Sequence, residues 1–329
     1  MKAILLVGGE GTRLRPFTLE IPKPLVPILN LPYLEQFLFF LKQVQVHELI
    51  LAAGYLSDQI LDFCKRVSGS GIILKYLIEK EPLGTGGAIR NARAFLDETF
   101  LAFNADIVTN FDLRRLLQFH VVSKGEMTLG LVPVLDPSSF GAADLESTGR
   151  ILRFVEKPEK GKSPSNFINA GMYVMEPQVL DLIPEKEKVS LEREIFPKIA
   201  QSGKLYGFPW KCYWQDMGTL KNYLQIHQDF FKGELLLKIQ EGSVQKNGIF
   251  IGRGAQIDSS AQLGPCVVLG ENCQLGADVK ISNSVLWDQV IVEKGSCISN
   301  AIIGKKCVIR KNSIIREKAI SLSGEVNIV

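Results

Sequence analysis

A glycine-rich stretch near the N-terminus carries the residues best suited to phosphate chemistry. It reads Val7-Gly8-Gly9-Glu10-Gly11-Thr12-Arg13-Leu14-Arg15-Pro16-Phe17-Thr18 and is followed by Pro22-Lys23-Pro24. Glycines at the end of a strand let backbone N–H groups approach phosphate oxygens, and a following helix start favours an anion. Arg13, Arg15 and Lys23 add fixed cations. We therefore expect this stretch to hold a triphosphate, because positioning and charge neutralisation dominate reactions at phosphorus.

Two common nucleotide-binding motifs do not fit this stretch. It contains no G-x-x-x-x-G-K-[ST], and position 14 is leucine where a dinucleotide fingerprint carries its third glycine. Taken alone, a glycine loop with arginines is as often a tight turn with solvated charges. The remainder of the sequence has to decide between these interpretations.

The string G-G-x-G-T-R-L-R-P-x-T followed by P-K-P resembles the signature of the sugar nucleotidyltransferases, also called NDP-sugar pyrophosphorylases. The resemblance continues along most of the chain through Glu81–Ala88, Phe103–Asp106, Phe140–Gly141, Val155–Pro158, Asn169–Gly171 and Trp214–Thr219. It implies an enzyme that transfers a nucleotidyl group from a nucleoside triphosphate to a sugar 1-phosphate and releases pyrophosphate. The C-terminal part resembles that of mannose-1-phosphate guanylyltransferases, so the expected reaction is GTP plus mannose 1-phosphate to GDP-mannose.

The resemblance also assigns roles to individual residues. Arg13 is expected on the phosphates and Lys23 on the attacking or leaving phosphate. The expected nucleotide-binding residues are Gly8, Gly9, Gly11, Thr12, Leu83, Gly84, Thr85 and Gly86. The residues expected to contact the sugar phosphate are Gly141, Glu156, Lys157, Asn169 and Gly171.

Asp106 and Asp216 match the two aspartates that bind Mg²⁺ in the family. Hard oxygen ligands suit Mg²⁺ and leave coordination positions for water and substrate. Either aspartate alone would more often be a turn residue or a helix cap. Two departures from the family pattern are Ala105 in place of the usual glycine and Phe140 in place of the common tyrosine, and neither removes a ligand.

Other functions stay open on the sequence alone. Gly86-Gly87-Ala88 departs from the Ala-Gly-Pro of many eukaryotic relatives, so a heptose-1-phosphate guanylyltransferase or a glucose-1-phosphate uridylyl- or thymidylyltransferase is an alternative. A non-catalytic regulatory or scaffold homologue is another, although such proteins typically lose the loop cations or metal carboxylates. An acyltransferase acting through the C-terminal region is disfavoured, because no histidine follows His227 to serve as general base.

The secondary structure that must position these residues is predicted to be an α/β fold with a Rossmann-like mixed sheet. Apolar runs predict strands at Ala3–Val7, Leu49–Ala53, Phe100–Asn104, Met127–Val134, Ile151–Glu156 and Gly171–Met175. Helical periodicity predicts helices at Tyr33–Gln43, Ser57–Lys65 and Asn110–Val121. Strands alternating with helices indicate a mostly parallel sheet covered by helices. We assign residues 1–230 to the nucleotidyltransferase domain.

From Ile251 the apolar residues recur at every sixth position, which no helix face explains. They are Ile251, Ile257, Leu263, Leu269, Leu275 and Ile281, and then, after a shift in phase, Val285, Ile291, Cys297, Ile303, Ile309 and Ile315. This hexapeptide repeat predicts a left-handed β-helix over residues 247–329, preceded by a helical connector over 231–246. Because stacked coils leave flat faces and open ends, we expect a homo-oligomer formed through this C-terminal domain.

Composition sets outer limits on the function. The 329 residues are 46% hydrophobic, and 38 Lys and Arg nearly balance 35 Asp and Glu, which disfavours a nucleic-acid partner. No stretch approaches the roughly 20 apolar residues of a membrane span, and the N-terminal apolar run is too short for a secretory signal. The six cysteines contain no C-x-x-C pair, and the three histidines form no zinc motif. These features predict a cytoplasmic protein that has reduced thiols and no membrane partner.

Overall fold

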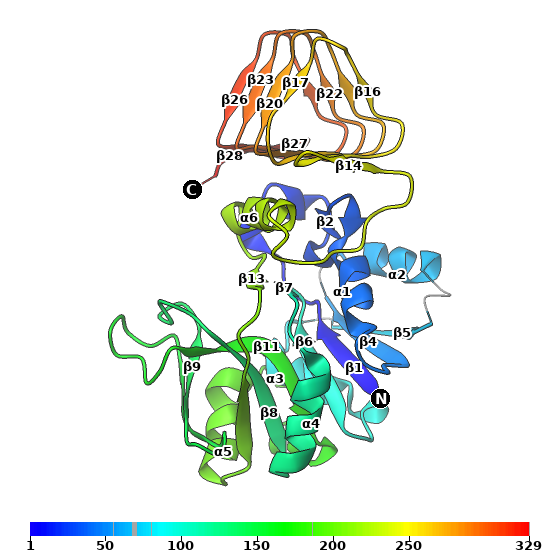
Figure 1. Cartoon of the computed structure of the whole chain (residues 1–329). Coiled ribbons are helices and arrows are strands. Elements are labelled where there is room, and N and C mark those ends of the chain that lie inside the picture. The colour runs from blue at the N-terminus through cyan, green and yellow to red at the C-terminus, as the bar shows by residue number, and fades with distance from the viewer. Residues whose placement is uncertain (55, 68–70, 80, 186, 329) are drawn as a thin grey trace. The chain divides into compact units, whose positions relative to one another are not determined.

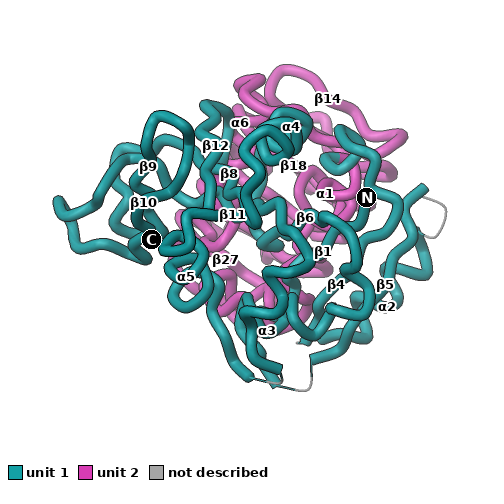
Figure 2. The backbone as a smooth tube through the Cα atoms, turned by 90° about the horizontal axis from the view of Figure 1, so that it is seen from below, with its two compact units in different colours: residues 1–9, 40–214 teal, residues 10–39, 215–329 magenta. Residues whose placement is uncertain are grey.

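The computed structural model describes residues 1–54, 56–67, 71–79, 81–185 and 187–328. The chain forms two compact units, each of which is discontinuous in sequence (Figure 2). Unit 1 consists of residues 1–9 and 40–214, and unit 2 consists of residues 10–39 and 215–329. Residues 10–39, which we call the N-terminal loop segment, therefore belong with the C-terminal part of the chain.

Unit 1 is built on a nine-stranded mixed sheet. Its path runs β10-β9-β11-β6-β1-β4-β5, with β8 paired to β11 and β12. The strands are β1 (Lys2–Leu6), β4 (Glu48–Ala53), β5 (Ile73–Ile78), β6 (Phe100–Asn104), β8 (Met127–Pro133), β9 (Gly141–Leu145), β10 (Ile151–Glu156), β11 (Phe167–Met175) and β12 (Leu205–Pro209). β1 lies parallel to both β4 and β6, whereas β11 is antiparallel to β6. The predicted mixed α/β sheet is confirmed.

Helices and turns connect the strands of unit 1. They are α2 (Ser57–Arg66), α3 (Gly84–Asn91), α4 (Leu113–Ser123), the π-helical turn Leu191–Ile195, α5 (Phe196–Gln201) and the 3₁₀ turns Arg93–Phe95 and Pro177–Leu182. The short β7 (Ile107–Thr109) follows β6, while α1 (Tyr33–Leu41) and β13 (Trp214–Asp216) contain the points where the chain passes between units. α4 begins three residues later than predicted, because Asp112 caps it by accepting a hydrogen bond from the Arg115 N–H.

The core of unit 1 explains why its strands form where they do. All six residues of β4 are buried, as expected for a parallel strand that is covered on both faces. Ile4, Phe100 and Tyr173 are fully buried in one apolar cluster with Phe196 of α5. The sheet thus has a rigid centre from which its strand ends can hold polar side chains.

Unit 2 contains a left-handed β-helix of stacked coils, yellow to red in Figure 1. Its three sheets run β14-β15-β18-β21-β24-β27-β28, β16-β19-β22-β25 and β17-β20-β23-β26. The strands are β14 (Val244–Lys246), β15 (Ile249–Ile251), β16 (Gln256–Ile257), β17 (Gln262–Leu263), β18 (Val267–Leu269), β19 (Gln274–Leu275), β20 (Lys280–Ser282), β21 (Ser284–Leu286), β22 (Ile291–Val292), β23 (Cys297–Ser299), β24 (Ile302–Ile303), β25 (Val308–Ile309), β26 (Ile314–Arg316), β27 (Lys318–Ser321) and β28 (Gly324–Asn327). We call these three sheets the first, second and third face.

The hexapeptide phase predicted for the third coil is wrong by one residue. The pairing of strands places Leu286 on Leu269, Val292 on Leu275 and Ile298 on Ile281. These residues, rather than the predicted Val285, Ile291 and Cys297, belong to the interior cluster. The reason is coil length: Leu286 stacks 17 positions after Leu269, whereas Leu269 stacks 18 positions after Ile251. The members Ile303, Ile309 and Ile315 are confirmed as interior.

The predicted helical connector over 231–246 is also wrong. α6 (Leu220–Phe231) ends at Phe231, residues 232–243 form turns and irregular structure, and Val244–Lys246 is strand β14. Gly233 has a φ of +81°, a conformation that ends the helix. Further along, Gln36 donates to the Lys238 carbonyl and accepts from its N–H at 2.9 and 2.8 Å, which ties the segment down in an extended form.

Two further observations concern membrane-spanning helices and the cysteines. Among the described residues, no helix is both long and apolar enough to cross a membrane. All six cysteines are free thiols; Cys273 and Cys307 are buried and the other four are half-buried.

Candidate active site

Three consecutive 3₁₀ turns shape the first part of the N-terminal loop segment: Thr12–Leu14, Phe17–Leu19 and Lys23–Leu25. Gly11 precedes them with a φ of +63°, and its carbonyl accepts a hydrogen bond from the Thr18 hydroxyl at 2.9 Å. A Cβ at Gly11 would lie 3.0 Å from the Thr18 methyl and 3.2 Å from the Lys23 Cβ. Glycine is therefore required here by both conformation and space, and it allows the turn that carries Arg13 to pack against Lys23.

The structure brings Arg13 and Asp216 together in unit 2. An Arg13 Nη2 lies 3.8 Å from Oδ2 of Asp216, and the arginine side chain is 63% exposed while the aspartate side chain is 15% exposed. The other Asp216 oxygen accepts a hydrogen bond from the Gly218 N–H. A Cβ at Gly218 would lie 2.5 Å from that oxygen and 2.6 Å from the Arg13 guanidinium. The pair thus depends on a close backbone approach that only glycine permits.

The start of α6 fixes the Asp216 turn. Thr219 is the N-cap and accepts from the Asn222 N–H at 3.1 Å, while the Asn222 amide donates to the Asp216 carbonyl at 2.8 Å. An aspartate held in this way presents its carboxylate in one orientation. Asp216 and Arg13 form the charged group of unit 2, and the turn of Lys23 packs against Gly11, two residues before Arg13.

The predicted nucleotide-binding stretch Leu83–Gly86 lies in unit 1 at the start of α3. Gly84 has a φ of +71°, and the Gly86 N–H donates to the Val189 carbonyl at 2.8 Å. The Thr85 hydroxyl donates to Glu192 at 2.8 Å and accepts from the Leu191 N–H at 2.9 Å. These bonds join the stretch to the segment before α5, so Thr85 and Gly86 have structural partners of their own.

Glu79 is a residue that the sequence analysis missed. Its Oε2 accepts from the Leu83 N–H at 3.4 Å and would lie 3.4 Å from a Cβ placed on Gly8. Its other oxygen is buried and has no hydrogen-bond partner among the described residues. Burial raises the pKa of this carboxyl group above its usual range. No motif marks Glu79, since it only precedes the Glu81–Ala88 stretch.

The predicted sugar-phosphate residues gather at the start of β9, at the end of β10 and in the middle of β11, where its register shifts. Gly141 pairs with Glu156 in the β9–β10 register, and a Cβ at Gly141 would lie 2.8 Å from the Glu156 carboxylate. On β11 the side-chain Oδ1 of Asn169 accepts from the Gly171 N–H at 2.9 Å, and its Nδ2 donates to the Tyr173 hydroxyl. Burial, and then the nearby Glu192, raise the pKa of Glu156.

Two further side chains complete this group, and neither was assigned a role from the sequence. Asn104, at the end of β6, would lie 3.0 Å from a Cβ on Gly171, and its Oδ1 is buried without a hydrogen-bond partner among the described residues. Trp214 donates its indole N–H to the Ala170 carbonyl at 3.0 Å and packs edge-on against Phe140 at 5.3 Å. Burying the Asn104 Oδ1 without a hydrogen bond costs stability unless a ligand donates to it.

The remaining predicted residues occupy turns. Lys157 has a φ of +50° and donates its N–H to the Phe140 carbonyl at 3.0 Å, which places it directly after β10. Asp106 lies in the turn between β6 and β7, next to the buried Ala105. The predicted site residues thus fall into two groups: Gly8, Gly9, Leu83–Gly86, Asp106 and the sugar-phosphate residues in unit 1, and Gly11, Thr12, Arg13, Lys23 and Asp216 in unit 2.

The donors present suit a divalent metal ion. Asp106 and Asp216 offer carboxylate oxygens, and Asp216 is oriented by the Gly218 N–H. The described part of the chain contains no cluster of three or more His, Cys, Asp or Glu side chains. An ion that completes its coordination with water and substrate phosphates needs only one or two protein ligands.

Comparison with known proteins gives family matches along nearly the whole chain. Residues 2–233 match the family described as nucleotidyl transferase, and residues 228–329 match the EIF2B subunit epsilon LbH domain. The chain is 36% identical to a mannose-1-phosphate guanylyltransferase of Mycobacterium tuberculosis over 90% of its own length and 82% of the relative's length. It is 37% identical to mannose-1-phosphate guanylyltransferase 1 of Arabidopsis thaliana over 92% of its length and 86% of that protein's length.

A solved structure has a similar fold. A crystal structure of HddC from Yersinia pseudotuberculosis, complexed with GMP-PN, superposes with a TM-score of 0.60 at 29% identity, covering 70% of this chain and 99% of that one. Nucleotidyltransferases of this kind generally use a divalent metal. The chain is therefore an enzyme that belongs to the nucleotidyl transferase family.

Proposed function

We propose that this enzyme transfers the guanylyl group of GTP to mannose 1-phosphate, forming GDP-mannose and releasing pyrophosphate. The observation that carries the proposal is the charged group of unit 2, in which Arg13 lies 3.8 Å from Asp216 beside the turn of Lys23. Two anionic substrates repel each other, and fixed cations offset that repulsion. The guanylyltransferase relatives, alike over 90% and 92% of the chain, favour the choice of GTP and mannose 1-phosphate.

The reaction is an in-line displacement. A phosphate oxygen of mannose 1-phosphate attacks the α-phosphorus of GTP, and the bond from that phosphorus to the oxygen bridging to the β-phosphate breaks. The electron pair leaves with pyrophosphate, so no covalent enzyme intermediate forms. In this proposal Arg13 binds the triphosphate and Lys23 binds the attacking or leaving phosphate. Gly8, Gly9, Gly11 and Thr12 supply the backbone approach to the nucleotide.

We propose Mg²⁺ as the metal, with Asp106 and Asp216 as its protein ligands. When bound, the ion supplies charge neutralisation for the phosphate oxygens. The protein's own contribution is orientation: the Gly218 N–H and the Asn222 amide hold Asp216 in place, whereas the turn after β6 holds Asp106. Neither aspartate needs to move a proton.

Glu79 is our candidate for reading the base. Guanine presents an N1–H and an N2–H₂ donor side by side, and one ionised carboxylate can accept both. Uracil and thymine offer only one such donor on the corresponding edge. The unpartnered oxygen of Glu79 lies in the same group as Gly8 and Leu83, which were expected at the nucleotide. Glu79→Gln should raise the KM for GTP more than the KM for mannose 1-phosphate.

For the sugar phosphate we propose Glu156 and Asn169 as hydrogen-bonding groups, with Lys157 on its phosphate. The paired register of Gly141 and Glu156 leaves no room for a larger residue at position 141. Gly171 and Asn104 form the neighbouring wall. The hydroxyl groups of mannose would satisfy the buried Asn104 oxygen, which the protein leaves without a partner in its described part.

We also propose a homo-oligomer that assembles through the C-terminal β-helix, in a cytoplasmic enzyme. The second and third faces carry exposed residues, among them Gln256, Gln262 and Ile314, which leaves surface for a second copy. Light scattering on the purified chain measures the mass directly, and a mass of one chain at all concentrations would end this part of the proposal.

The experiment that tests the function is pyrophosphate release by the purified protein with Mg²⁺. GTP, UTP, dTTP, ATP and CTP are each combined with mannose-, glucose- and heptose-1-phosphates. We expect the largest kcat/KM with GTP and mannose 1-phosphate. Preference for another pair would replace the substrates and keep the transfer chemistry, whereas no turnover with any pair would contradict the function itself.

A further inference from the structure

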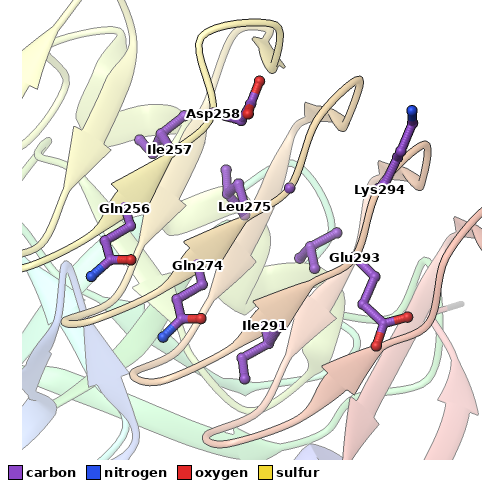
Figure 3. Close-up of a pocket in the computed structure, with 10 residues that line it drawn as sticks. Gln256, Ile257, Asp258, Gln274, Leu275, Ile291, Glu293 and Lys294 are labelled. Carbon is purple, nitrogen blue, oxygen red and sulfur yellow. The ribbon is translucent and has the colours of Figure 1, made fainter.

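The three faces of the β-helix differ in what they present outward. On the second face Gln256 and Gln274 point outward and are exposed, with the half-buried Ile291 next in the row (Figure 3). The third face likewise presents Gln262 and Lys280. The outer row of the second face continues to the exposed Val308 and that of the third face to the exposed Ile314, so both outer surfaces are polar only in their first two coils.

The first face is apolar on its outer side. Strand alternation places one residue of each coil outward there, between the interior residues of the same strand. This row, which we call the apolar row, consists of Phe250, Val268, Val285, Ile302 and Ala319, and every member is at most 3% exposed. A row of this kind is buried only when another part of the protein covers it.

The N-terminal loop segment contacts this face inside unit 2. Phe17 stacks on Trp287, which directly follows β21, with ring centroids 4.6 Å apart. Asn30 donates its amide to the Leu269 carbonyl at 2.8 Å, and Glu20 accepts from the Ser323 N–H at 2.9 Å. Three separate points of the segment are thus fixed to three different coils.

α6 provides a second link between the β-helix and the same segment. The Trp287 indole N–H donates to the Tyr223 hydroxyl at 3.0 Å, and that hydroxyl donates to the Pro27 carbonyl at 2.5 Å. One turn further, His227 accepts the Leu29 N–H at its Nε2 at 3.3 Å, so its Nδ1 carries the proton and donates to the Tyr223 carbonyl at 2.9 Å. Trp287, Tyr223 and His227 are all buried, so this chain of bonds is shielded from water.

The anchored positions are close in sequence to the residues that carry charge. Phe17 lies between Arg13 and Lys23, and Pro27 follows Lys23 by four residues. Three short 3₁₀ turns have few hydrogen bonds of their own and hold a defined shape only when packing fixes them. The packing of Phe17 on Trp287 and the hydrogen bond to the Pro27 carbonyl therefore fix the positions of Arg13 and Lys23.

We propose that Trp287 and Tyr223 are positioning residues for nucleotidyl transfer: through Phe17 and Pro27, the first face of the β-helix holds the loop of Arg13 and Lys23 in its reactive shape. This inference rests on the proposed function and extends it, because it makes the C-terminal domain part of the catalytic apparatus in addition to any role in assembly.

The test compares Trp287→Ala with Ile298→Ala in the full-length protein. Ile298 is a buried interior residue of the β-helix that belongs to the third face, so its truncation loosens the domain without touching Phe17 or Tyr223. Trp287→Ala should lower kcat about 10- to 100-fold, the scale expected for a displaced catalytic group, while Ile298→Ala keeps kcat within about twofold. Thermal unfolding should show a comparable loss of stability for both variants.

Two conservative variants separate the effect of the hydrogen bonds from the effect of side-chain volume. Trp287→Phe keeps a ring against Phe17 and loses the indole N–H, and Tyr223→Phe removes only the hydroxyl that joins Trp287 to Pro27. Each should show an intermediate loss of kcat and a smaller loss of stability than Trp287→Ala, since each removes a buried hydrogen bond and keeps most of the packing. These two also serve if Trp287→Ala does not fold.

Hydrogen exchange gives a readout that does not need activity. Amides of residues 11–28 should exchange faster in Trp287→Ala than in Ile298→Ala or the wild type. Equal exchange in this segment, together with wild-type kcat in Trp287→Phe and Tyr223→Phe, would overturn the inference. A wild-type protein that is inactive with every substrate pair would refute the proposed function, and the exchange comparison would still decide whether the β-helix holds the loop.

Discussion

The two units hold their functional residues by different physical means. In unit 2 the charged groups range from Arg13, whose side chain is 63% exposed on a short turn, to Asp216, whose side chain is 15% exposed at the end of β13. In unit 1 the polar groups sit half-buried at the ends of paired strands, as with Glu156 opposite Gly141. Charge acts over several ångströms and tolerates water, whereas hydrogen-bond selection needs fixed, desolvated partners. On the proposed roles, Arg13 acts through its charge on an exposed turn, whereas Glu156 acts through hydrogen bonds at the end of a strand.

The strongest way to break this comparison is to remove one charge from each unit. Lys23→Ala in unit 2 and Asp106→Asn in unit 1 should each lower kcat by about 10²- to 10³-fold or more, as when a preorganised electrostatic group is lost. Steady-state pyrophosphate release measures the effect. The matched control is Lys162→Ala, because Lys162 is exposed and forms an ion pair with Glu159, and this variant should keep full activity. Near-normal turnover in either test variant would contradict the assignment, provided that circular dichroism shows both are folded.

A smaller effect is expected from crowding the charged group without deleting it. In Gly218→Ala the new methyl group would meet the Asp216 carboxylate and the Arg13 guanidinium at 2.5 and 2.6 Å. Displacing both should lower kcat/KM about 10- to 100-fold. Gly9→Ala adds a methyl with no described protein atom within 4 Å, so any rise in its KM for GTP reports ligand approach instead. Unchanged kinetics in Gly218→Ala would show that the Arg13–Asp216 distance is unimportant.

The third test concerns stability and is confined to unit 2. Burial lowers the pKa of His227 to about 4, against about 6.5 in an unfolded chain. The unfolded state therefore binds the proton more readily, and stability falls as the pH drops from about 6.5 towards 4. The loss amounts to about 3 kcal/mol at the low end of this window. Urea unfolding at pH 7 and pH 4.5 should show a smaller pH dependence in His227→Gln than in the wild type, and equal dependence would contradict a buried neutral His227.

The smallest expected effect concerns the pKa of Glu156 in unit 1. After burial, the charge of Glu192 is the next cause of the raised pKa of Glu156. Glu192→Gln keeps a side-chain oxygen that can accept from Thr85 and removes the charge, so the pKa of Glu156 should fall. Carboxyl ¹³C NMR titration measures it, with Glu194→Gln as a neighbouring control. A rise, or no change, would show that Glu192 does not act on Glu156 through its charge.

Sequence reasoning worked best where one physical preference dominates. Phe100–Asn104 and Ile151–Glu156 form strands at the predicted residues, because continuous apolar runs leave little choice of register. The β-helix was visible from its period. Its phase in the third coil was not, since one residue fewer in a coil shifts Leu286 inward in place of Val285, and both are apolar.

The site was predictable only as far as its motifs reach. Resemblance marked Arg13 and Asp216, and the structure places them together in one unit. It could not mark Glu79 or Trp287, because their roles depend on partners about 70 and 270 residues away along the chain, near Gly8 and Phe17. Thr85 shows the converse, since its motif indicates a ligand contact while its hydroxyl bonds to Glu192 and the Leu191 amide.

The discontinuity of unit 2 has a consequence for synthesis of the chain. Residues 10–39 leave the ribosome about 180 residues before the first of their partners in α6, a delay of roughly 10 to 40 s at about 5–20 residues per second. During that interval Leu29 lacks His227, to which its N–H donates in the finished protein, and Phe17 lacks Trp287. If Trp287 and Tyr223 hold the loop of Arg13 and Lys23 as proposed, a segment made among the first acquires its final shape only after residue 287 has been added.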